Sequence, residues 1–362
     1  MKVTITLIAL IIILGISSYQ LLSKKTATNI NPSPSLTSDN KAPKIDTVAK
    51  NLEVPWAIAF LPDGQLLVTE RPGRLQKIVN GKTQLIHTFS EVKQLGEGGL
   101  HGIAVDPNFN TNHQLYAYFT YGQLGNQTLN RVIKAKLETD KLTEIKTIVN
   151  AIPGATVHDG GRIKFGPDGY LYITTGDAQN PSLSQDKNSL AGKILRVTDD
   201  GNPAPGNPFN TLVYSYGHRN PQGITWDNLG RLWATEHGNQ ATDELNLIEP
   251  GKNYGWPIIR GDEKRLDLIS PKLQSGTNTW APAGAAFYKG SILFAGLRGQ
   301  ALFEVKLDTL ELKEHFKGEL GSIREVAVGP DNMLYITTSN RDGRGNPKAE
   351  DDQILRVNPT SL

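Results

Sequence analysis

From Ala57 onward, apolar residues alternate with polar or small ones in short runs, and pairs of runs are separated by turns built on Pro-Asp-Gly or a variant of it. Alternation with a period of two is typical of strands with one buried face, and such a turn between two strands predicts a hairpin. The unit recurs six times along the chain, with copies that begin at Ala57, Gly102, Arg162, Gly223, Gly284 and Glu325.

A further strand-like run follows several of these copies, for example RLQKIV from Arg74 and QILRV from Gln353. No helical periodicity of useful length interrupts the pattern. Repeats of this kind predict one antiparallel sheet each, and therefore an all-β fold, a six-bladed β-propeller of four-stranded antiparallel blades. We expect it to occupy residues 44–362, with the last strands pairing with the segment around 45–52 to close the ring.

The N-terminus has a different character. Lys2 precedes an apolar run over residues 3–16, which is followed by a mixed stretch and then Lys24 and Lys25. This pattern predicts export, with residues 1–25 as a signal peptide or an N-terminal membrane anchor, because the run approaches the ~20 residues that span a bilayer. Residues 26–43, rich in Ser, Thr, Asn and Pro, predict a flexible linker. The rest of the chain is then extracytoplasmic, in the periplasm or at the cell surface.

Charge and composition narrow the function. The chain has 38 Lys and Arg against 36 Asp and Glu, so no excess of positive charge indicates binding to nucleic acid. It has no cysteine, which excludes disulfides, thiolate metal sites and a cysteine nucleophile. Any metal therefore takes oxygen or imidazole ligands, and an oxygen-rich loop favours calcium or magnesium.

Polar clusters precede the same strand in successive repeats. They contain Glu97 before the second copy, His158 before the third, Arg219 with Asn220 before the fourth, and Arg324 at the sixth. Radial blades bring such loops to one mouth of the central channel, and an acid, histidines and arginines gathered there indicate a small anionic or polyhydroxylated ligand.

The stretch 154–177 carries a candidate catalytic pair. His158 lies in its loop, and an alternating strand ends at Asp177. A strand could place this carboxylate beside the imidazole, which orients a histidine and makes it more basic. The alternative is a solvated loop histidine, since Gly-Asp after a strand is also ordinary turn chemistry.

Loops after the second strands indicate a cation site. Gly238 and Asn239 stand in a glycine-rich loop, which can turn backbone carbonyls toward a hard cation, and the carboxylates of Asp243 and Glu244 are nearby. The spacing matches no recognised calcium loop, and Asp243-Glu244 can equally be a solvated turn. We expect the aromatic residues of this region to pack, although their flat faces can wall a cofactor pocket: Tyr254, Trp256 and Trp280.

At these residues the chain resembles the soluble quinoprotein sugar dehydrogenases, the glucose/sorbosone dehydrogenase family, and most closely its aldose sugar dehydrogenase branch. The resemblance covers roughly residues 51–357. The segments that carry it are EGGLHGIAVDPNF from Glu97, HDGGRIKFGPDG from His158, YGHRNPQGITW from Tyr216, TEHGNQATDELNLIEPGKNYGWP from Thr235 and REVAVGPD from Arg324.

The resemblance implies that the chain binds pyrroloquinoline quinone (PQQ) and Ca2+ at the channel mouth and oxidises aldose sugars at C1 to lactones. The electrons would then pass to an external acceptor, a quinone, cytochrome or dye. It further implies that His158 is the general base, that Asp177 supports it, and that Glu97 lies near substrate and cofactor.

The resemblance also implies cofactor and metal ligands. Residues that match cofactor contacts are Arg219, Asn220, Arg298 and Arg324. Gly238 and Asn239 match positions whose backbone carbonyls bind calcium, and Glu244 and Tyr254 are candidates for a second calcium ion.

The chain departs from the better-studied glucose enzymes of the family at several site positions. Ser322 stands where those enzymes have an arginine, which removes one charged contact to the cofactor. Arg298 replaces a lysine, Val157 replaces an acidic residue and Asn239 replaces a proline. The loops are also short, which indicates an open site with broad sugar specificity.

Two other functions remain open at this stage. One is a non-enzymatic propeller that binds a ligand or a partner protein, since fold alone does not determine function. The other is a metal-dependent lactonase, which would need carboxylates and amides around a central cation. The residues available for it are Asp177, Asn220 and Glu97.

Overall fold

The computed structural model describes residues 44–122 and 127–362. The predicted signal peptide or anchor and the linker lie outside the described residues. Among the residues that are described, no helix has the length and apolar content needed to cross a membrane.

Six antiparallel sheets of four strands each make up the fold, as predicted. We number the sheets as blades 1 to 6 in chain order of their first strands. Blade 1 contains β2 (Pro55–Phe60), β3 (Leu66–Glu70), β4 (Arg74–Val79) and β5 (Lys82–Thr88). Blade 2 contains β6 (Leu100–Val105), β7 (Gln114–Gly122), β8 (Thr128–Glu138) and β9 (Lys141–Gly154). Blade 3 contains β10 (Ile163–Phe165), β11 (Leu171–Thr175), β12 (Lys193–Val197) and β13 (Val213–Tyr216).

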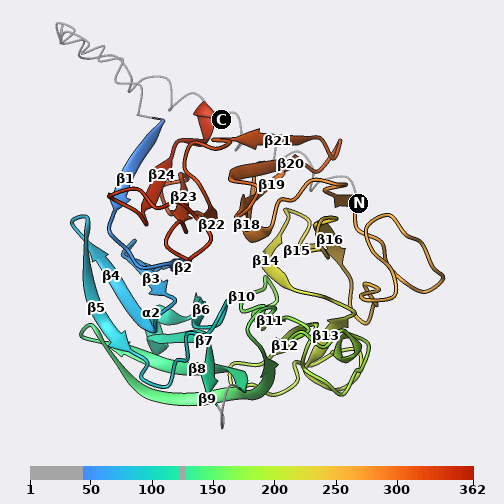
Figure 1. The fold of residues 1–362 in the computed structure, drawn as a ribbon. Coiled ribbons are helices and arrows are strands. Elements are labelled where there is room, and N and C mark those ends of the chain that lie inside the picture. The colour runs from blue at the N-terminus through green and yellow to red at the C-terminus, as the bar shows by residue number, and fades with distance from the viewer. Residues whose placement is uncertain (1–43, 123–126) are drawn as a thin grey trace, which may run out of the picture. The chain divides into compact units, whose positions relative to one another are not determined.

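Blades 4 to 6 continue the series around the ring (Figure 1). Blade 4 contains β14 (Pro221–Trp226), β15 (Leu232–Glu236), β16 (Glu244–Ile248) and β17 (Leu273–Gln274). Blade 5 contains β18 (Pro282–Tyr288), β19 (Ser291–Gly296), β20 (Ala301–Lys306) and β21 (Leu312–His315). Blade 6 contains β22 (Ile323–Val328), β23 (Leu334–Thr338), β24 (Ile354–Val357) and β1 (Ile45–Ala49). The described helices are short: α2 (Phe109–Asn112) and the 3₁₀ helices η1 (Pro181–Ser184) and η2 (Pro359–Ser361).

Blade 6 closes the ring with strands from both ends of the described chain. β1 pairs antiparallel with β24, so that Ile45 lies opposite Val357 and Thr47 opposite Leu355. The predicted pairing of the last strands with the segment around 45–52 is therefore confirmed.

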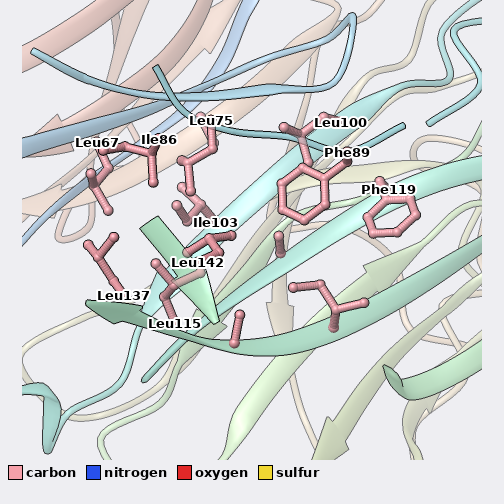
Figure 2. Close-up of a cluster of buried hydrophobic side chains, with 14 of the residues drawn as sticks. Leu67, Leu75, Ile86, Phe89, Leu100, Ile103, Leu115, Phe119, Leu137 and Leu142 are labelled. Atoms are coloured by element: carbon pink, nitrogen blue, oxygen red, sulfur yellow. The ribbon is translucent and has the colours of Figure 1, made fainter. Parts of the chain in front are cut away.

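The core lies between the faces of neighbouring blades. In β3, Leu67 packs into the cluster shared by blades 1 and 2, whereas the next residue, Val68, packs into the cluster on the opposite face. Both faces of this strand are covered, so all five of its residues are buried. Figure 2 shows the first of these clusters, where Leu75 and Phe89 of blade 1 face Leu115 and Phe119 of blade 2.

The first strands of the blades surround the central channel (Figure 1). At one level of the channel, four blades contribute only small residues: Ala57, Gly102, Gly223 and Gly284. Blades 3 and 6, which stand opposite each other in a ring of six, contribute Arg162 and Glu325 instead, and these two side chains form a buried ion pair across the channel. A Cβ on Gly284 would lie 2.0 Å from the Glu325 carboxylate, so the small residues leave the space that the pair fills.

We predict that each half of this pair stabilises the fold only in the presence of the other. Arg162→Met or Glu325→Gln alone leaves the other member of the pair buried without its ion-pair partner. Each single variant should therefore lower the free energy of unfolding by about 3–5 kcal/mol. The double variant should lose less than either single variant. Urea unfolding at pH 7 measures all three.

The matched control is the exposed pair Lys317–Glu314, whose side chains are 53% and 41% exposed. Lys317→Met should change stability by less than about 1 kcal/mol. Additive losses in the Arg162→Met/Glu325→Gln double variant would show that the pair is not coupled.

Candidate active site

The predicted site residues come from loops at one end of the channel. Glu97, His158, Arg219 and Arg324 lie at or just before the first strands of blades 2, 3, 4 and 6, and Asp177 follows the second strand of blade 3. In antiparallel blades, the chain enters the first strand and leaves the second strand at the same end. Hydrogen bonds between these loops bring Glu97 to His158 and His158 to Asp177.

His158 and Asp177 form the predicted pair. Nδ1 of His158 lies 2.7 Å from Oδ1 of Asp177, and the other carboxylate oxygen accepts a hydrogen bond of 2.8 Å from Nε1 of Trp256. Gly176 makes this approach possible, because a Cβ there would lie 1.9 Å from the carbonyl oxygen of His158. The carboxylate is thus held from two sides and fixes the orientation of the imidazole.

Glu97 lies beside this pair. Its carboxylate accepts hydrogen bonds from the backbone N–H of His158 (3.2 Å) and from Nη1 of Arg344 (2.7 Å). Burial alone would raise the pKa of Glu97, but its interactions with His237, with Arg344 and with the His158 N–H together lower it to about 2. Glu97 is therefore ionised at neutral pH and balances part of the positive charge around it.

A cluster of basic side chains has spare hydrogen-bond donors or acceptors. Each member has one buried nitrogen without a partner in the described part of the chain: Nε of Arg71, Nε of Arg219, Nε of Arg324 and Nε2 of His237. Nη1 of Arg324 donates to Gln222 (3.0 Å), and its Nη2 lies 3.8 Å from Asp342. Burial lowers the pKa of Arg324 to about 10, so it stays charged at neutral pH.

This cluster fits a ligand that carries carboxylates. Buried cations with free N–H groups are stabilised by charge-assisted hydrogen bonds to such groups, and the geometry of arginine suits them. The side chain of Arg219 also lies over the ring of Trp256, 5.4 Å from its centroid, so a flat aromatic surface adjoins the charged groups.

Two predicted cofactor residues differ in their surroundings. Asn220 is buried, and its Oδ1 accepts a hydrogen bond of 3.0 Å from the N–H of Gly160, which ties the Arg219 loop to the His158 loop. Arg298 is exposed, and no contact recorded for the described residues joins it to the rest of the site. It lines a separate cavity with Trp280 and Lys317.

The loop predicted to bind calcium is organised by Asp243. One Asp243 oxygen accepts from the N–H of Gly238 (2.9 Å), and the other accepts from those of Trp280 and Ala281. Within the described residues, no hydrogen bond is made to the carbonyl oxygens of Gly238 or Asn239. Nor do they contain a group of three or more His, Asp or Glu side chains that could hold a metal, so a cation here would depend on carbonyls.

The two residues predicted to bind a second calcium ion, Glu244 and Tyr254, differ in which oxygen atoms they can offer to it. Glu244 is surrounded by protein, and burial together with the charge of Glu236 raises its pKa to about 8, which a nearby cation would reverse. The Tyr254 hydroxyl donates to the Leu247 carbonyl (2.7 Å) and accepts from the N–H of Glu249 (2.8 Å). That hydroxyl is occupied, and only the carbonyl of Tyr254 remains as a ligand.

Sequence reasoning did not assign Arg71, Arg344 or His237 to the site, and it expected Trp256 to pack or to wall a cofactor pocket, not to bind Asp177. One signal was available. Arg71 and His237 directly follow the second strands of their blades, near the place that Asp177 holds in blade 3. The bond from Trp256 to Asp177 had no comparable signal, because the long loop that carries Trp256 follows the third strand of blade 4.

The model of the Glucose / Sorbosone dehydrogenase family matches residues 52–355. The chain belongs to this family. It is 32% identical to quinoprotein glucose dehydrogenase B of Acinetobacter calcoaceticus, with 96% of each chain covered. It is 30% identical to the aldose sugar dehydrogenase YliI of Escherichia coli, covering 87% of this chain and 92% of that one.

Solved structures agree with this assignment. The PQQ-bound aldose sugar dehydrogenase of Streptomyces coelicolor matches with a TM-score of 0.82 and 41% identity, covering 86% of this chain and 97% of that chain. The resemblance seen in the sequence is confirmed, and this member of the glucose/sorbosone dehydrogenase family is an oxidoreductase of the quinoprotein sugar dehydrogenase type.

We predict a pH-dependent loss of stability from Asp159, the residue after His158. Its Oδ1 accepts from Asn130 (3.0 Å) and from the N–H of Ala155 (3.1 Å), while Oδ2 is buried without a partner among the described residues. Burial raises the pKa of Asp159 to about 7, with a further contribution from Glu97. The stabilisation from the neutral carboxyl is full below the unfolded pKa of about 3.9 and is lost as the pH rises to about 7.

Asp159→Asn stays neutral at every pH. Relative to this variant, the wild-type protein should lose on the order of 3 kcal/mol of unfolding free energy between pH 4 and pH 7, as measured by urea unfolding. Asp262→Asn, at an exposed position, is the control and should follow the wild type. Parallel curves for wild type and Asp159→Asn would show that Asp159 is ionised throughout.

Proposed function

We propose that this protein oxidises aldose sugars at C1 to lactones, with PQQ bound at the channel mouth and an external acceptor such as a quinone, cytochrome or dye receiving the electrons. One observation carries the proposal: an imidazole oriented by a carboxylate lies in a mouth rich in cations with spare donors. Membership in the family supports the same activity. We also propose that the protein acts outside the cytoplasm, which cell fractionation of the full-length chain would test.

His158 has the geometry of a general base. With the Asp177 carboxylate as acceptor, Nδ1 of His158 carries the proton and Nε2 keeps its lone pair. Nε2 takes the proton of the anomeric hydroxyl as the C1–H bond breaks and the carbonyl of the lactone forms. When bound, the quinone supplies the two-electron acceptor for the hydride that leaves C1. Asp177 stabilises the imidazolium that results, and Trp256 keeps Asp177 in place.

The basic cluster would hold the carboxylates of the quinone. Arg219 and Arg324 fill this role in the proposal, and Arg71 adds a cation at the same mouth. Arg71 offsets the absence of an arginine at Ser322, whose N–H donates to Asn340 (2.9 Å) in the loop after β23. Both Arg71 and Arg324 interact electrostatically with Asp342 and with each other. Arg298 remains a predicted contact to the cofactor.

Calcium enters the proposal through the loop after β15. The carbonyl oxygens of Gly238 and Asn239 would hold the ion next to Arg219, where it would polarise the quinone. A second ion would use the carboxylate of Glu244 and the carbonyl of Tyr254.

Titration of the apo-protein with PQQ and calcium, followed by calorimetry and absorbance, tests the proposed function. We expect PQQ to bind, glucose to reduce it, and His158→Ala to lower turnover by about 10²–10⁴-fold while PQQ still binds. His315→Ala, on the outer strand of blade 5, is the matched control and should keep full turnover.

Other outcomes would overturn the proposal. If PQQ fails to bind at micromolar concentration, the protein is a binding propeller without this chemistry. If it hydrolyses lactones without added quinone, the metal-dependent lactonase is correct.

Removal of calcium should weaken cofactor binding and lower thermal stability. Excess EGTA should abolish the tight binding of PQQ, and added calcium should restore it. At calcium concentrations 100-fold above Kd, each site adds about 2.7 kcal/mol to the free energy of unfolding. Glu244→Gln should lose part of this gain but keep the calcium-dependent binding of PQQ.

The control for Glu244→Gln is Glu249→Gln at an exposed position, which should keep the full gain. Equal melting temperatures in EGTA and in calcium would exclude both sites.

A further inference from the structure

The far end of the channel contains a second cavity, of about 430 Å³. It is lined by the ends of the first strands of all six blades, whereas His158 and its neighbours lie where these strands begin. Near the end of each first strand, one residue is half-buried and apolar. In blades 1, 3, 4 and 6 this residue pairs with the first residue of the second strand, and in blades 2 and 5 it lies at the equivalent position. These residues form an apolar ring, which we define as Phe60, Val105, Phe165, Trp226, Phe287 and Val328.

One position further into the channel, the six blades differ. Five of them contribute small side chains: Ala59, Ala104, Thr225, Ala286 and Ala327. Blade 3 contributes Lys164, which also lines the cavity and whose ammonium makes no hydrogen bond among the described residues. The six repeats are therefore not equivalent at this level, because only blade 3 contributes a long cationic side chain.

The Arg162–Glu325 pair forms the inner end of the cavity. Arg162 is 5% exposed; it donates to Glu325 and, through Nε, to the carbonyl of Gln222 (2.9 Å). Its Nη2 is buried and has no partner in the described part of the chain. Glu325 is the only acid among the residues that line the cavity, against the two cations Arg162 and Lys164.

This arrangement leaves one positive charge without a counterion in an otherwise apolar space. Burying an unpaired charge is costly, and burial indeed lowers the pKa of Lys164, a change that Glu325 opposes and Arg162 reinforces. An anion would bond to the free donors of both cations. The apolar ring would favour an anion that also has an apolar body, because its burial contributes roughly 25 cal/mol per Å².

We propose that this cavity binds a small organic carboxylate, with its charged end at Lys164 and Arg162 and its apolar body inside the ring. Thr225, at the equivalent position of blade 4, also lines the cavity, and its hydroxyl accepts a hydrogen bond of 3.0 Å from the N–H of Phe287. The proposal does not depend on the sugar dehydrogenase activity, since the ion pair separates this cavity from the residues around His158.

Benzoate is a suitable probe, and isothermal titration calorimetry at fixed ionic strength measures its binding to the full-length protein. Benzoate should bind with saturation and raise the melting temperature. Benzyl alcohol, which lacks the charge, and acetate, which lacks the apolar body, should each bind more weakly by about tenfold or more.

Three variants locate the site. Lys164→Thr reproduces the residue that blade 4 carries at this level, so the fold accommodates it, and it should raise the Kd for benzoate by about 10–100-fold. Lys313→Thr removes the same charge from the exposed outer strand of blade 5 and should leave the Kd unchanged. Arg219→Met, at the other end of the channel, should also leave it unchanged.

The proposal is wrong if benzoate does not bind, or if it binds equally well to Lys164→Thr. It is also wrong if Arg219→Met abolishes binding, since benzoate would then occupy the basic cluster near His158. Equal affinity for acetate and benzoate would reduce the site to one for any small anion and would overturn the role of the apolar ring.

Discussion

Pairing of β24 with β1 holds the ring closed, and the geometry of the active site depends on this seam. The loop between β23 and β24 carries Asp342 and Arg344. Arg344 bonds to Glu97 of the loop before blade 2, and the Asp342 carbonyl accepts from Arg71 of blade 1, so these contacts join positions 247 and 271 residues apart. If the seam opened, Glu97 would lose Arg344 and Arg71 would lose Asp342. The site is therefore a property of the closed ring and not of any single blade.

Several buried basic side chains at the channel mouth each have one nitrogen without a partner among the described residues, although unpaired polar atoms are costly to bury. Glu97 and Asp342 offset part of the positive charge, but one nitrogen each of Arg71, Arg219 and Arg324 stays unpaired in the part of the chain that the structure describes. Groups arranged in advance do not have to reorganise when a ligand arrives. Local rules of polar satisfaction are broken most often at functional sites, and here several of the unpaired atoms lie at the mouth where His158 and Asp177 pair.

Much of this could be predicted from the sequence. The alternating strands and their turns repeat visibly, so the blade count and the ring closure followed from local pattern, and glycine-rich loops before the first strands marked Glu97, His158 and Arg219. The bond between Trp256 and Asp177 could not be predicted, because it depends on the path of a long loop with no periodic signal. The bond from Arg344 to Glu97 was equally hidden, since residue type and family likeness do not reveal where a side chain points.

The buried ion pair in the channel has a consequence for symmetry. A propeller of six similar repeats presents an almost sixfold environment along its axis, and a small guest there would find six nearly equal orientations. Lys164 and Arg162 belong to blade 3 and Glu325 to blade 6 on the other side of the axis, so the charges in the channel do not follow the sixfold arrangement of the blades. A charged guest would therefore prefer one of these orientations over the others.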